Sequence, residues 1–239
     1  MDTSSFTTLT FDCYGTLIDW ESGIWDGLQM MLCANGSDKP RSTALVDFAA
    51  VESAIQAKTP SMLYPEVLAR THAQLAKEWG YQTTTEMDER FGAFVPYWNA
   101  FEDSADALRK LAKRYKLVIL SNVDRTSFAG SNARLGVNFD AICTAEDIGS
   151  YKPHPQNFPY MLDALERDHN TTQDQVLHVA QSLFHDIKPG KAAGLPCVWI
   201  DRQDLAGGGS WGATAHVENV PEPDKRFTSL AAFADWACR

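Results

Sequence analysis

The chain has 239 residues, with 21 Lys and Arg against 31 Asp and Glu, which gives a formal net charge of −10. This acidic balance argues against a protein that binds nucleic acid or an acidic membrane surface, and no apolar run approaches the roughly 20 residues of a membrane span. The chain opens without the pattern of a secretory signal and its five cysteines form no CxxC pair, so a cytoplasmic protein with reduced thiols and no zinc site is expected.

Short apolar runs rich in β-branched and aromatic residues predict four buried strands. They lie at residues 8–14, 116–122, 175–182 and 196–202. Helical periodicity appears between or after them, at residues 104–116, 157–168 and 185–195. This alternation predicts an α/β protein whose parallel sheet is covered by helices on both faces.

The stretch between the first two predicted strands has a different pattern. From about residue 22 to residue 90 it is almost wholly helical, with turn signals such as Asn35-Gly36 and Thr59-Pro60 between the helices. A helical insertion at this point predicts a cap over the carboxyl edge of the sheet, where open α/β sheets bind ligands. We therefore expect a core domain of residues 1–18 and 98–239 and a helical cap domain of residues 19–97.

Polar side chains gather in four short segments that are expected to lie at, or just past, the carboxyl ends of strands. Because the carboxyl ends of parallel strands converge on one edge, these side chains are expected to share a cleft. They supply a carboxylate that can act as a nucleophile, an ammonium that keeps it ionised, and hydroxyl and amide groups that can hold a substrate. The residues are Asp12 with Thr16, Ser121 with Asn122, Lys152, and Ser182 with Asp186.

Four motifs in this order and spacing resemble the haloacid dehalogenase (HAD) superfamily. They are "DCYGT" from Asp12, "LSN" from Leu120, "YKP" from Tyr151, and Asp186 followed by Gly194. The resemblance covers the whole chain and implies a Rossmann-like α/β core with an inserted helical cap. It also implies a hydrolase that uses Asp12 as a nucleophile.

Two positions favour the metal-free 2-haloacid dehalogenase branch over the magnesium-dependent phosphatases. By the resemblance, a phosphatase carries an acid two residues after the nucleophile, where this chain has Tyr14. It also carries a metal-binding aspartate just before Ser182, where this chain has the neutral Gln181, a poor partner for a hard dication. Halide leaves without a proton, whereas phosphoryl transfer without Mg²⁺ would lose its main charge stabilisation. No metal and no cofactor are therefore expected.

The resemblance implies a two-step displacement on a small carboxylic acid. Asp12, held by Thr16, attacks C2 and forms an aspartyl ester, and water then hydrolyses that ester. Ser121 would hold the substrate carboxylate, and Asn122 would face the leaving halide. Asp186 would orient Lys152 or the hydrolytic water. The expected substrate-binding residues are Tyr14, Asn122, Ser182, Gln181, Arg41, Trp20, Tyr64 and Trp98, the last three as walls of the pocket.

The chain departs from the dehalogenase pattern at the expected halide site. Those enzymes place an arginine on the second cap helix, but "LVDFAAVESAIQ" contains none, and Arg41 lies just upstream of it. Arg41 is therefore a surface residue or a substitute for that arginine. Phe158 and Leu183 also replace polar residues of the family.

Three functions stay open at this point. The first is a hydrolase of the 2-haloacid dehalogenase type, or of a non-halogenated carboxylic acid on the same scaffold. The second is a magnesium-dependent small-molecule phosphatase, and the third is a binding protein that has lost catalysis. The expected partner is a small carboxylic acid, with no nucleic acid and no membrane. Related dehalogenases are often dimers, so a homodimer is also expected.

Overall fold

A parallel six-stranded sheet forms the centre of the computed structural model, which describes residues 1–209, 212–213, 219 and 221–239. The order of its strands is β3-β2-β1-β4-β5-β6. Their bounds are β1 Thr8–Phe11, β2 Lys116–Ser121, β3 Ala141–Thr144, β4 Val176–Ala180, β5 Cys197–Ile200 and β6 Lys225–Phe227. The four predicted strands are confirmed as β1, β2, β4 and β5. The two outermost strands, β3 and β6, were not predicted.

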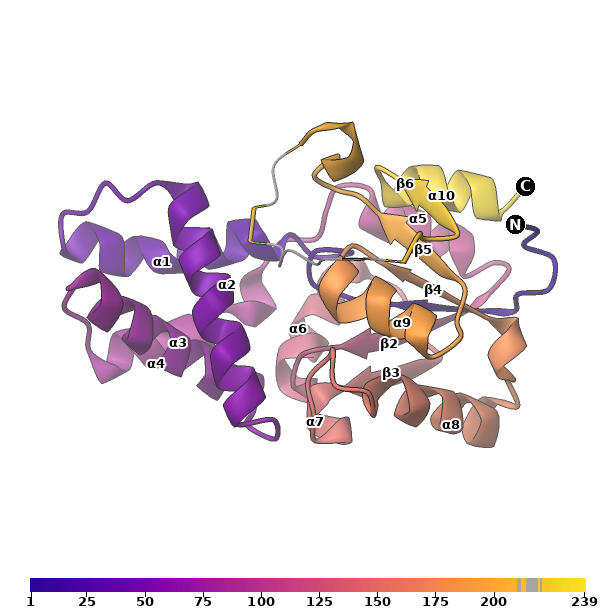
Figure 1. The fold of residues 1–239 in the computed structure, drawn as a ribbon, viewed down its shortest axis with the longest axis horizontal. Helices are drawn as coiled ribbons and strands as arrows, with labels where there is room; N and C mark the ends of the chain where they lie inside the picture. The colour runs from indigo at the N-terminus through magenta and orange to yellow at the C-terminus, as the bar shows by residue number, and fades with distance from the viewer. Residues whose placement is uncertain (210–211, 214–218, 220) are drawn as a thin grey trace.

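Helices cover both faces of the sheet, as predicted (Figure 1). Alternate residues of each strand point to opposite faces, so Leu117 and Ile119 of β2 join one apolar cluster while Val118 and Leu120 join the other. The first cluster includes side chains of α5 (Ser104–Leu111), α6 (Arg125–Leu135) and α10 (Leu230–Ala237), and the second includes side chains of α8 (Asn157–His169). The shorter α7 (Ala145–Ile148) follows β3, and α9 (Lys188–Ala192) precedes β5.

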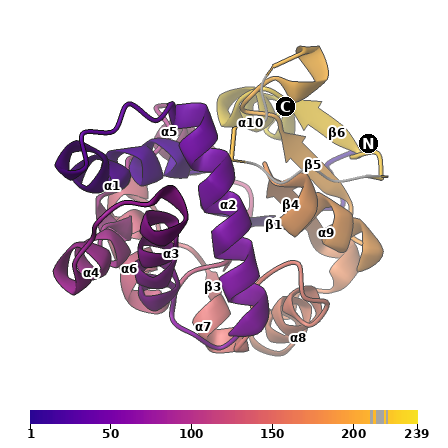
Figure 2. The ribbon, with the colours of Figure 1, turned by 60° about the vertical axis from the view of Figure 1, so that its left-hand side comes forward.

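Four helices lie between β1 and α5, and we call residues 20–97 the helical insert. They are α1 (Trp20–Ala34), α2 (Arg41–Lys58), α3 (Tyr64–Trp79) and α4 (Thr85–Gly92), followed by a short 3₁₀ turn, η1 (Val95–Tyr97). In Figures 1 and 2 these helices stand beside the carboxyl edge of the sheet, and α2 is the one that runs across it. None of the helices in the described part of the chain is long and apolar enough to cross a membrane.

The insert joins the core through closely packed aromatic side chains. Trp98 is buried, and a Cβ atom added to Gly23 of α1 would lie only 2.2 Å from its ring. The ring of Tyr14 meets Trp98 edge-on, with 5.4 Å between the ring centroids. Trp98 therefore packs at the junction between the two parts of the molecule.

Candidate active site

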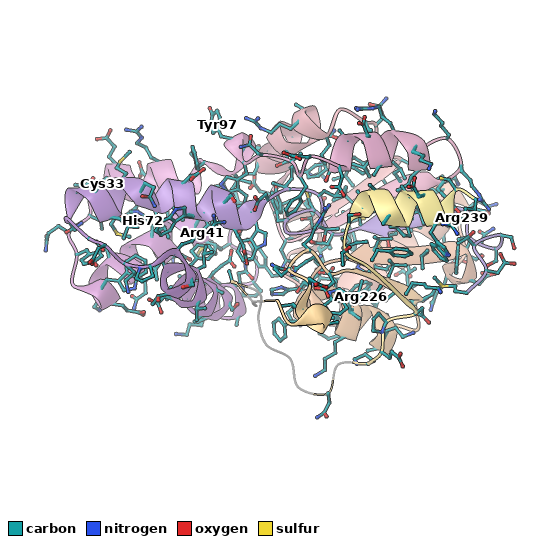
Figure 3. All side chains as sticks on the ribbon, turned by 90° about the horizontal axis from the view of Figure 1, so that it is seen from above. Cys33, Arg41, His72, Tyr97, Arg226 and Arg239 are labelled. Carbon is teal, nitrogen blue, oxygen red and sulfur yellow. The ribbon has the colours of Figure 1, made fainter. Side chains whose placement is uncertain are left out.

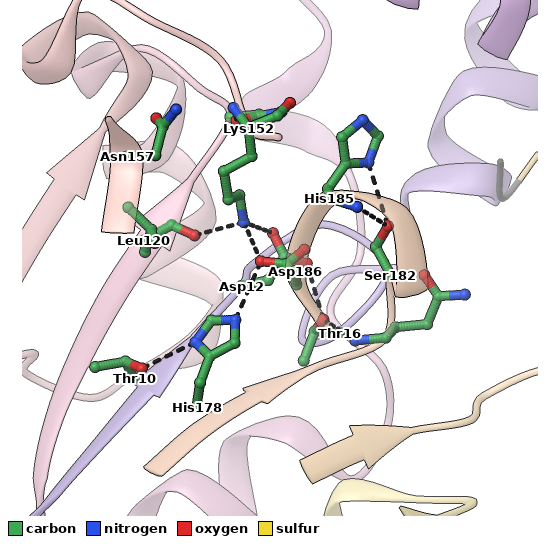
Figure 4. A network of polar contacts seen from close by, with 12 residues as sticks. Thr10, Asp12, Thr16, Leu120, Lys152, Asn157, His178, Ser182, His185 and Asp186 are labelled. Carbon is green, nitrogen blue, oxygen red and sulfur yellow. Dashed lines mark hydrogen bonds and ion pairs between the residues drawn. The ribbon is translucent and has the colours of Figure 1, made fainter. Parts of the chain in front are cut away.

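Asp12 follows the central strand β1 and lies almost completely buried at the carboxyl edge of the sheet. The chain turns back at Gly15, whose φ of +92° favours glycine, and a Cβ atom there would lie 2.8 Å from the indole nitrogen of Trp20. This turn brings Thr16 back to Asp12, and its hydroxyl donates to Oδ2 of Asp12 at 2.8 Å (Figure 4). The local sequence thus fixes the angle of the carboxylate.

Lys152 is buried beside Asp12, and its ammonium group has three acceptors. Nζ donates to Oδ1 of Asp12 at 3.0 Å, to Oδ1 of Asp186 at 2.6 Å and to the carbonyl oxygen of Leu120 at 2.8 Å (Figure 4). An ammonium group has three N–H donors, so this set uses all of them. Lys152 is therefore a fixed countercharge shared by two carboxylates.

The side chain of Asn122 holds the backbone of Lys152. Its Nδ2 donates to the Lys152 carbonyl at 2.9 Å, and its Oδ1 accepts from the Lys152 amide at 2.7 Å. Sequence reasoning placed Asn122 opposite a leaving halide, but these two bonds already occupy both ends of its amide. The geometry instead favours a positioning role for Asn122.

Asp186 lies behind Lys152 and is fully buried. Its Oδ1 also lies 3.2 Å from Nε2 of His178, whose Nδ1 is 2.9 Å from the hydroxyl of Thr10 (Figure 4). His178 is thus a buried histidine in β4 with a polar contact at each ring nitrogen. The second oxygen of Asp186, Oδ2, has no hydrogen-bond partner among the described residues.

The pKa values of the two carboxyl groups shift in opposite directions. Burial raises the pKa of Asp12 above its ordinary value, against the opposing effect of the Lys152 ammonium. Burial also acts on Asp186, but there Lys152 and His178 prevail and lower the pKa below its ordinary value. Lys152 loses stabilisation through burial but gains more from both aspartates, so its pKa is raised. Asp186 and Lys152 therefore form the ionised pair that supports Asp12.

A small cavity of about 60 Å³ opens in front of Asp12. The buried Ser121 lines it at the end of β2, and its hydroxyl has no hydrogen-bond partner among the described residues. A buried polar group without a partner is costly, so this hydroxyl is suited to hold a polar atom of a ligand. The cavity is lined by Asp12, Tyr14, Trp20, Glu52, Gln56, Tyr64, Ser121, Asn122, Lys152, Ser182, His185 and Asp186.

Glu52 on α2 is a cavity residue that sequence reasoning missed. Its side chain is buried, and Oε1 accepts a hydrogen bond from the hydroxyl of Tyr64 at 2.7 Å. Burial raises the pKa of Glu52 to about 7, although the Tyr64 hydrogen bond acts in the opposite direction. The available signal was an acid at the centre of the apolar segment "AAVESAI". In the dehalogenases that the chain resembles, the second cap helix brings an arginine to the site. In this chain the corresponding helix, α2, brings Glu52 to the cavity instead.

His185 is a second cavity residue that was not among the expected site residues. It lies in a π-helical turn, η3 (Leu183–Ile187), which Ser182 begins by accepting a hydrogen bond from the His185 amide at 3.0 Å. The Ser182 hydroxyl also lies 3.2 Å from Nδ1 of the His185 ring (Figure 4). Burial lowers the pKa of His185 to about 4, so the ring is neutral at pH 7.

The structure brings Tyr14, Trp20 and Tyr64 to the cavity wall, but it places other expected residues elsewhere. Trp98 is not among the described residues that line the cavity. Gln181 donates through Nε2 to Gln203 at 2.7 Å, and its backbone amide donates to Thr16.

Arg41 is exposed on the helical insert, where Nη2 donates to the Ser22 hydroxyl at 3.0 Å (Figure 3). Of the two interpretations of Arg41, the geometry favours the surface residue.

The oxygen donors around Asp12 are a poor fit for a divalent metal. Magnesium favours several hard oxygen ligands in an octahedral arrangement, usually including carboxylates. Here the Lys152 ammonium stands between the two nearest carboxylates, Asp12 and Asp186. Within the described ranges, no three His, Cys, Asp or Glu side chains are grouped so that they could hold a metal ion.

The chain is similar to known hydrolases in both sequence and fold. A model of the haloacid dehalogenase-like hydrolases matches residues 6–194. YfnB of Bacillus subtilis, whose name places it among the HAD-hydrolases, is 25% identical over 203 residues, which cover 82% of this chain and 84% of YfnB. Its crystal structure, bound to magnesium, has a TM-score of 0.75 at 20% identity, with 97% and 98% of the two chains covered.

A solved dehalogenase has the same fold. The L-2-haloacid dehalogenase from Xanthobacter autotrophicus has a TM-score of 0.78 at 19% identity, and the match covers 96% of this chain and 97% of that enzyme. At this level of identity, the likeness shows the shared fold.

Proposed function

Because this chain belongs to the haloacid dehalogenase-like hydrolases, we propose that it is a metal-independent hydrolase that displaces a leaving group from C2 of a small carboxylic acid. This is the reaction type of a 2-haloacid dehalogenase. The observation that carries the proposal is the setting of Asp12, whose carboxylate is held by Thr16 and Lys152 and faces a cavity. We also propose that the helical insert is the cap of this site and that the protein works in the cytoplasm.

In the first step, a carboxylate oxygen of Asp12 attacks C2 of the substrate. The new C–O bond forms as the bond to the leaving group breaks, and a halide departs with the bonding electrons. The product of this step is an ester between Asp12 and the substrate. Lys152 keeps Asp12 ionised for the attack, and the free hydroxyl of Ser121 donates to the substrate carboxylate.

In the second step, water attacks the carboxyl carbon of the Asp12 ester. The ester bond breaks on the Asp12 side, so the substrate leaves as a 2-hydroxy acid that keeps an oxygen atom of Asp12. Oδ2 of Asp186, which has no partner among the described residues, is suited to accept a hydrogen bond from this water. Overall, a hydroxyl group replaces the halide at C2, and the remaining proton of water is released together with the halide ion.

The dimensions of the cavity set the size of the substrate. At about 60 Å³ it is much smaller than the roughly 300–1,000 Å³ of sites for drug-sized ligands, so a short acid fits and a long one does not. No arginine is among the described residues that line it, and the one lysine has used its donors. Hydrogen bonds from neutral groups therefore hold the substrate.

Halide release from 2-bromopropionate and 2-chloropropionate tests this proposal. The purified protein is assayed in EDTA, beside an aryl phosphate assayed with magnesium. We expect halide release in EDTA that is lost in Asp12→Asn and retained in Asp38→Asn, the same change at an exposed position of the insert. Phosphate release that requires magnesium, without halide release, would instead show a phosphatase. No turnover of either substrate class would contradict the proposed reaction.

A further inference from the structure

The two walls of the Asp12 cavity carry different acids. The sheet supplies Asp12 and Asp186, both bonded to the Lys152 ammonium. The insert supplies Glu52, which has no cationic partner among the described residues and is bonded only to the neutral Tyr64 hydroxyl. Among the described residues no hydrogen bond is made by Oε2 of Glu52, and Glu52 lines the cavity. A buried acid without a cation is more stable when it is protonated.

We propose that Glu52, held by Tyr64, donates its proton to the leaving atom, and that the substrate is a carboxylic acid whose leaving atom at C2 is oxygen, namely a 2,3-epoxy acid. The inference rests on the proposed displacement by Asp12 and identifies the leaving group. Glu52 and Asp12 line the same small cavity from the insert and from the sheet. A short substrate between them would contact the nucleophile and the proton donor at once.

The chemistry of the leaving atom explains why an acid is useful here. Bromide and chloride are stable anions and depart without a proton. An alkoxide is a strong base, so opening of an epoxide ring is assisted by an acid that protonates the oxygen as the C–O bond breaks. A pKa of about 7 leaves a large fraction of Glu52 protonated at neutral pH and still lets it give up the proton.

The proposed reaction balances over two steps. Asp12 attacks C2, the bond from C2 to the ring oxygen breaks, and that oxygen takes the proton of Glu52 to become a hydroxyl on C3. Water then attacks the carboxyl carbon of the ester and gives one proton back to Glu52. The C2 oxygen leaves Asp12 with the other proton. Oxirane-2-carboxylate and one water thus give 2,3-dihydroxypropanoate.

The groups around Glu52 determine whether another residue of the cavity also changes its protonation state near pH 7. Tyr64 donates a hydrogen bond from α3, and burial raises the pKa of Tyr151 above its ordinary value, so this nearby phenol stays neutral. Across the cavity, the charge of Lys152 is offset by Asp12 and Asp186. The half-buried His185 is neutral at pH 7 because burial lowers its pKa to about 4. Glu52 is therefore the cavity group expected to lose a proton near pH 7.

The test compares oxirane-2-carboxylate with 2-bromopropionate across a range of pH. In Glu52→Gln, we expect kcat for the epoxide to fall by about 100-fold or more, because the amide cannot supply a proton, and kcat for bromide release to fall by much less, because bromide departs without a proton. In the unchanged protein, kcat for the epoxide should fall as the pH rises through about 7, the pKa of Glu52. The kcat for bromide release should show no such decline.

Three further variants separate a proton donor from a structural residue. Tyr64→Phe removes a hydrogen bond that lowers the pKa of Glu52, so the decline in epoxide turnover should move to higher pH. Glu52→Asp keeps a proton donor and should keep a pH-dependent epoxide reaction. Glu66→Gln, at an exposed position of α3, is the matched control and should change neither reaction.

The possible negative results distinguish the role of Glu52 as proton donor from the displacement by Asp12. Equal losses of epoxide and bromide turnover in Glu52→Gln would overturn the role as proton donor. Bromide release without any epoxide hydrolysis would also overturn it, while the displacement by Asp12 would stand. If neither substrate is consumed, the proposed function itself has failed.

Discussion

The sheet edge and the helical insert form the two walls of one cavity but are built differently. At the sheet edge, Asp12 and Asp186 share the ammonium of Lys152. Asp12 follows β1, and Asp186 lies within the turn η3. On the insert, Glu52 projects from the middle of α2 and has only the hydroxyl of Tyr64 as a partner. One wall is a network of ionised groups, and the other is a nearly neutral surface.

This difference suits the two walls to different chemical roles. A buried ion pair holds its members in one charge state, which suits a nucleophile that must stay ionised. An isolated buried acid has a pKa close to neutral pH, which suits a group that gives up a proton and takes it back. In our account the sheet therefore performs the attack, and the insert selects the leaving group.

Removal of Lys152 should produce the largest effect on the sheet wall. In Lys152→Met, Asp12 and Asp186 remain buried without their countercharge, and we expect the free energy of unfolding at pH 7 to fall by about 3 kcal/mol and turnover to be lost. Chemical denaturation with an activity assay measures both. Lys191→Met, which breaks a partly exposed pair with Asp224, should lower the free energy of unfolding by less than about 1 kcal/mol.

The pH dependence of this variant gives a sharper test. With Lys152 present, the lowered pKa of Asp186 contributes stability above the ordinary value of 3.8, and this contribution is lost as the pH falls through the lowered value. Without Lys152, burial raises the pKa of both carboxyls, so the folded state of the variant gains stability as the pH falls. The deficit should therefore be smaller at pH 5 than at pH 7. A deficit that does not change with pH would contradict the ion-pair account.

The same contrast explains what could be predicted from the sequence. Asp12, Ser121 and Lys152 lie at or beyond the ends of strands, and strand ends can be recognised from local apolar runs and the turns that follow. The convergence of parallel strands at one edge then brings these residues together. The fold class, the four central strands and the polar cluster at the sheet edge could be predicted for this reason.

The insert could not be predicted at the same level. Helix α2 buries Phe48, Val51, Glu52 and Gln56, so its apolar residues do not identify which side meets the cavity and which meets α3. Only tertiary packing makes that choice. The edge strands β3 and β6 were missed because they have four and three residues and are partly exposed.

His185, where the sheet edge approaches the insert, should have a smaller effect. Its pKa is lowered from 6.5 to about 4, so the unfolded chain binds a proton between these values that the folded protein does not. Stability should therefore fall as the pH falls from about 6.5 toward 4, by about 1 kcal/mol once solvent screening of this half-buried ring is included.

Comparison of His185→Gln with the unchanged protein isolates this contribution. Denaturation at pH 7 and pH 5 should show less loss of stability in the variant than in the unchanged protein. The exposed His154→Gln should behave like the unchanged protein. The same loss in all three proteins would show that His185 titrates normally in the folded state.

Arg41 should have the smallest effect, although it is the first residue of α2. Its guanidinium bonds to the Ser22 hydroxyl on the surface of the insert and does not line the Asp12 cavity. We expect Arg41→Ala to change kcat and KM by less than about 2-fold, as for other surface substitutions. A loss of 10-fold or more in a steady-state assay would show that the insert presents Arg41 to the substrate.

The most direct test of the central claim, that Asp12 forms an ester with the substrate, follows the oxygen atom of the product. The protein in excess over 2-bromopropionate is allowed a single turnover in H₂¹⁸O, and the mass of the 2-hydroxypropionate formed is measured. We expect the new hydroxyl to contain ¹⁶O from Asp12 and the heavy oxygen to appear in the Asp12 carboxylate. Heavy oxygen in the hydroxyl after that single turnover would show that water attacks C2 directly and would contradict the account.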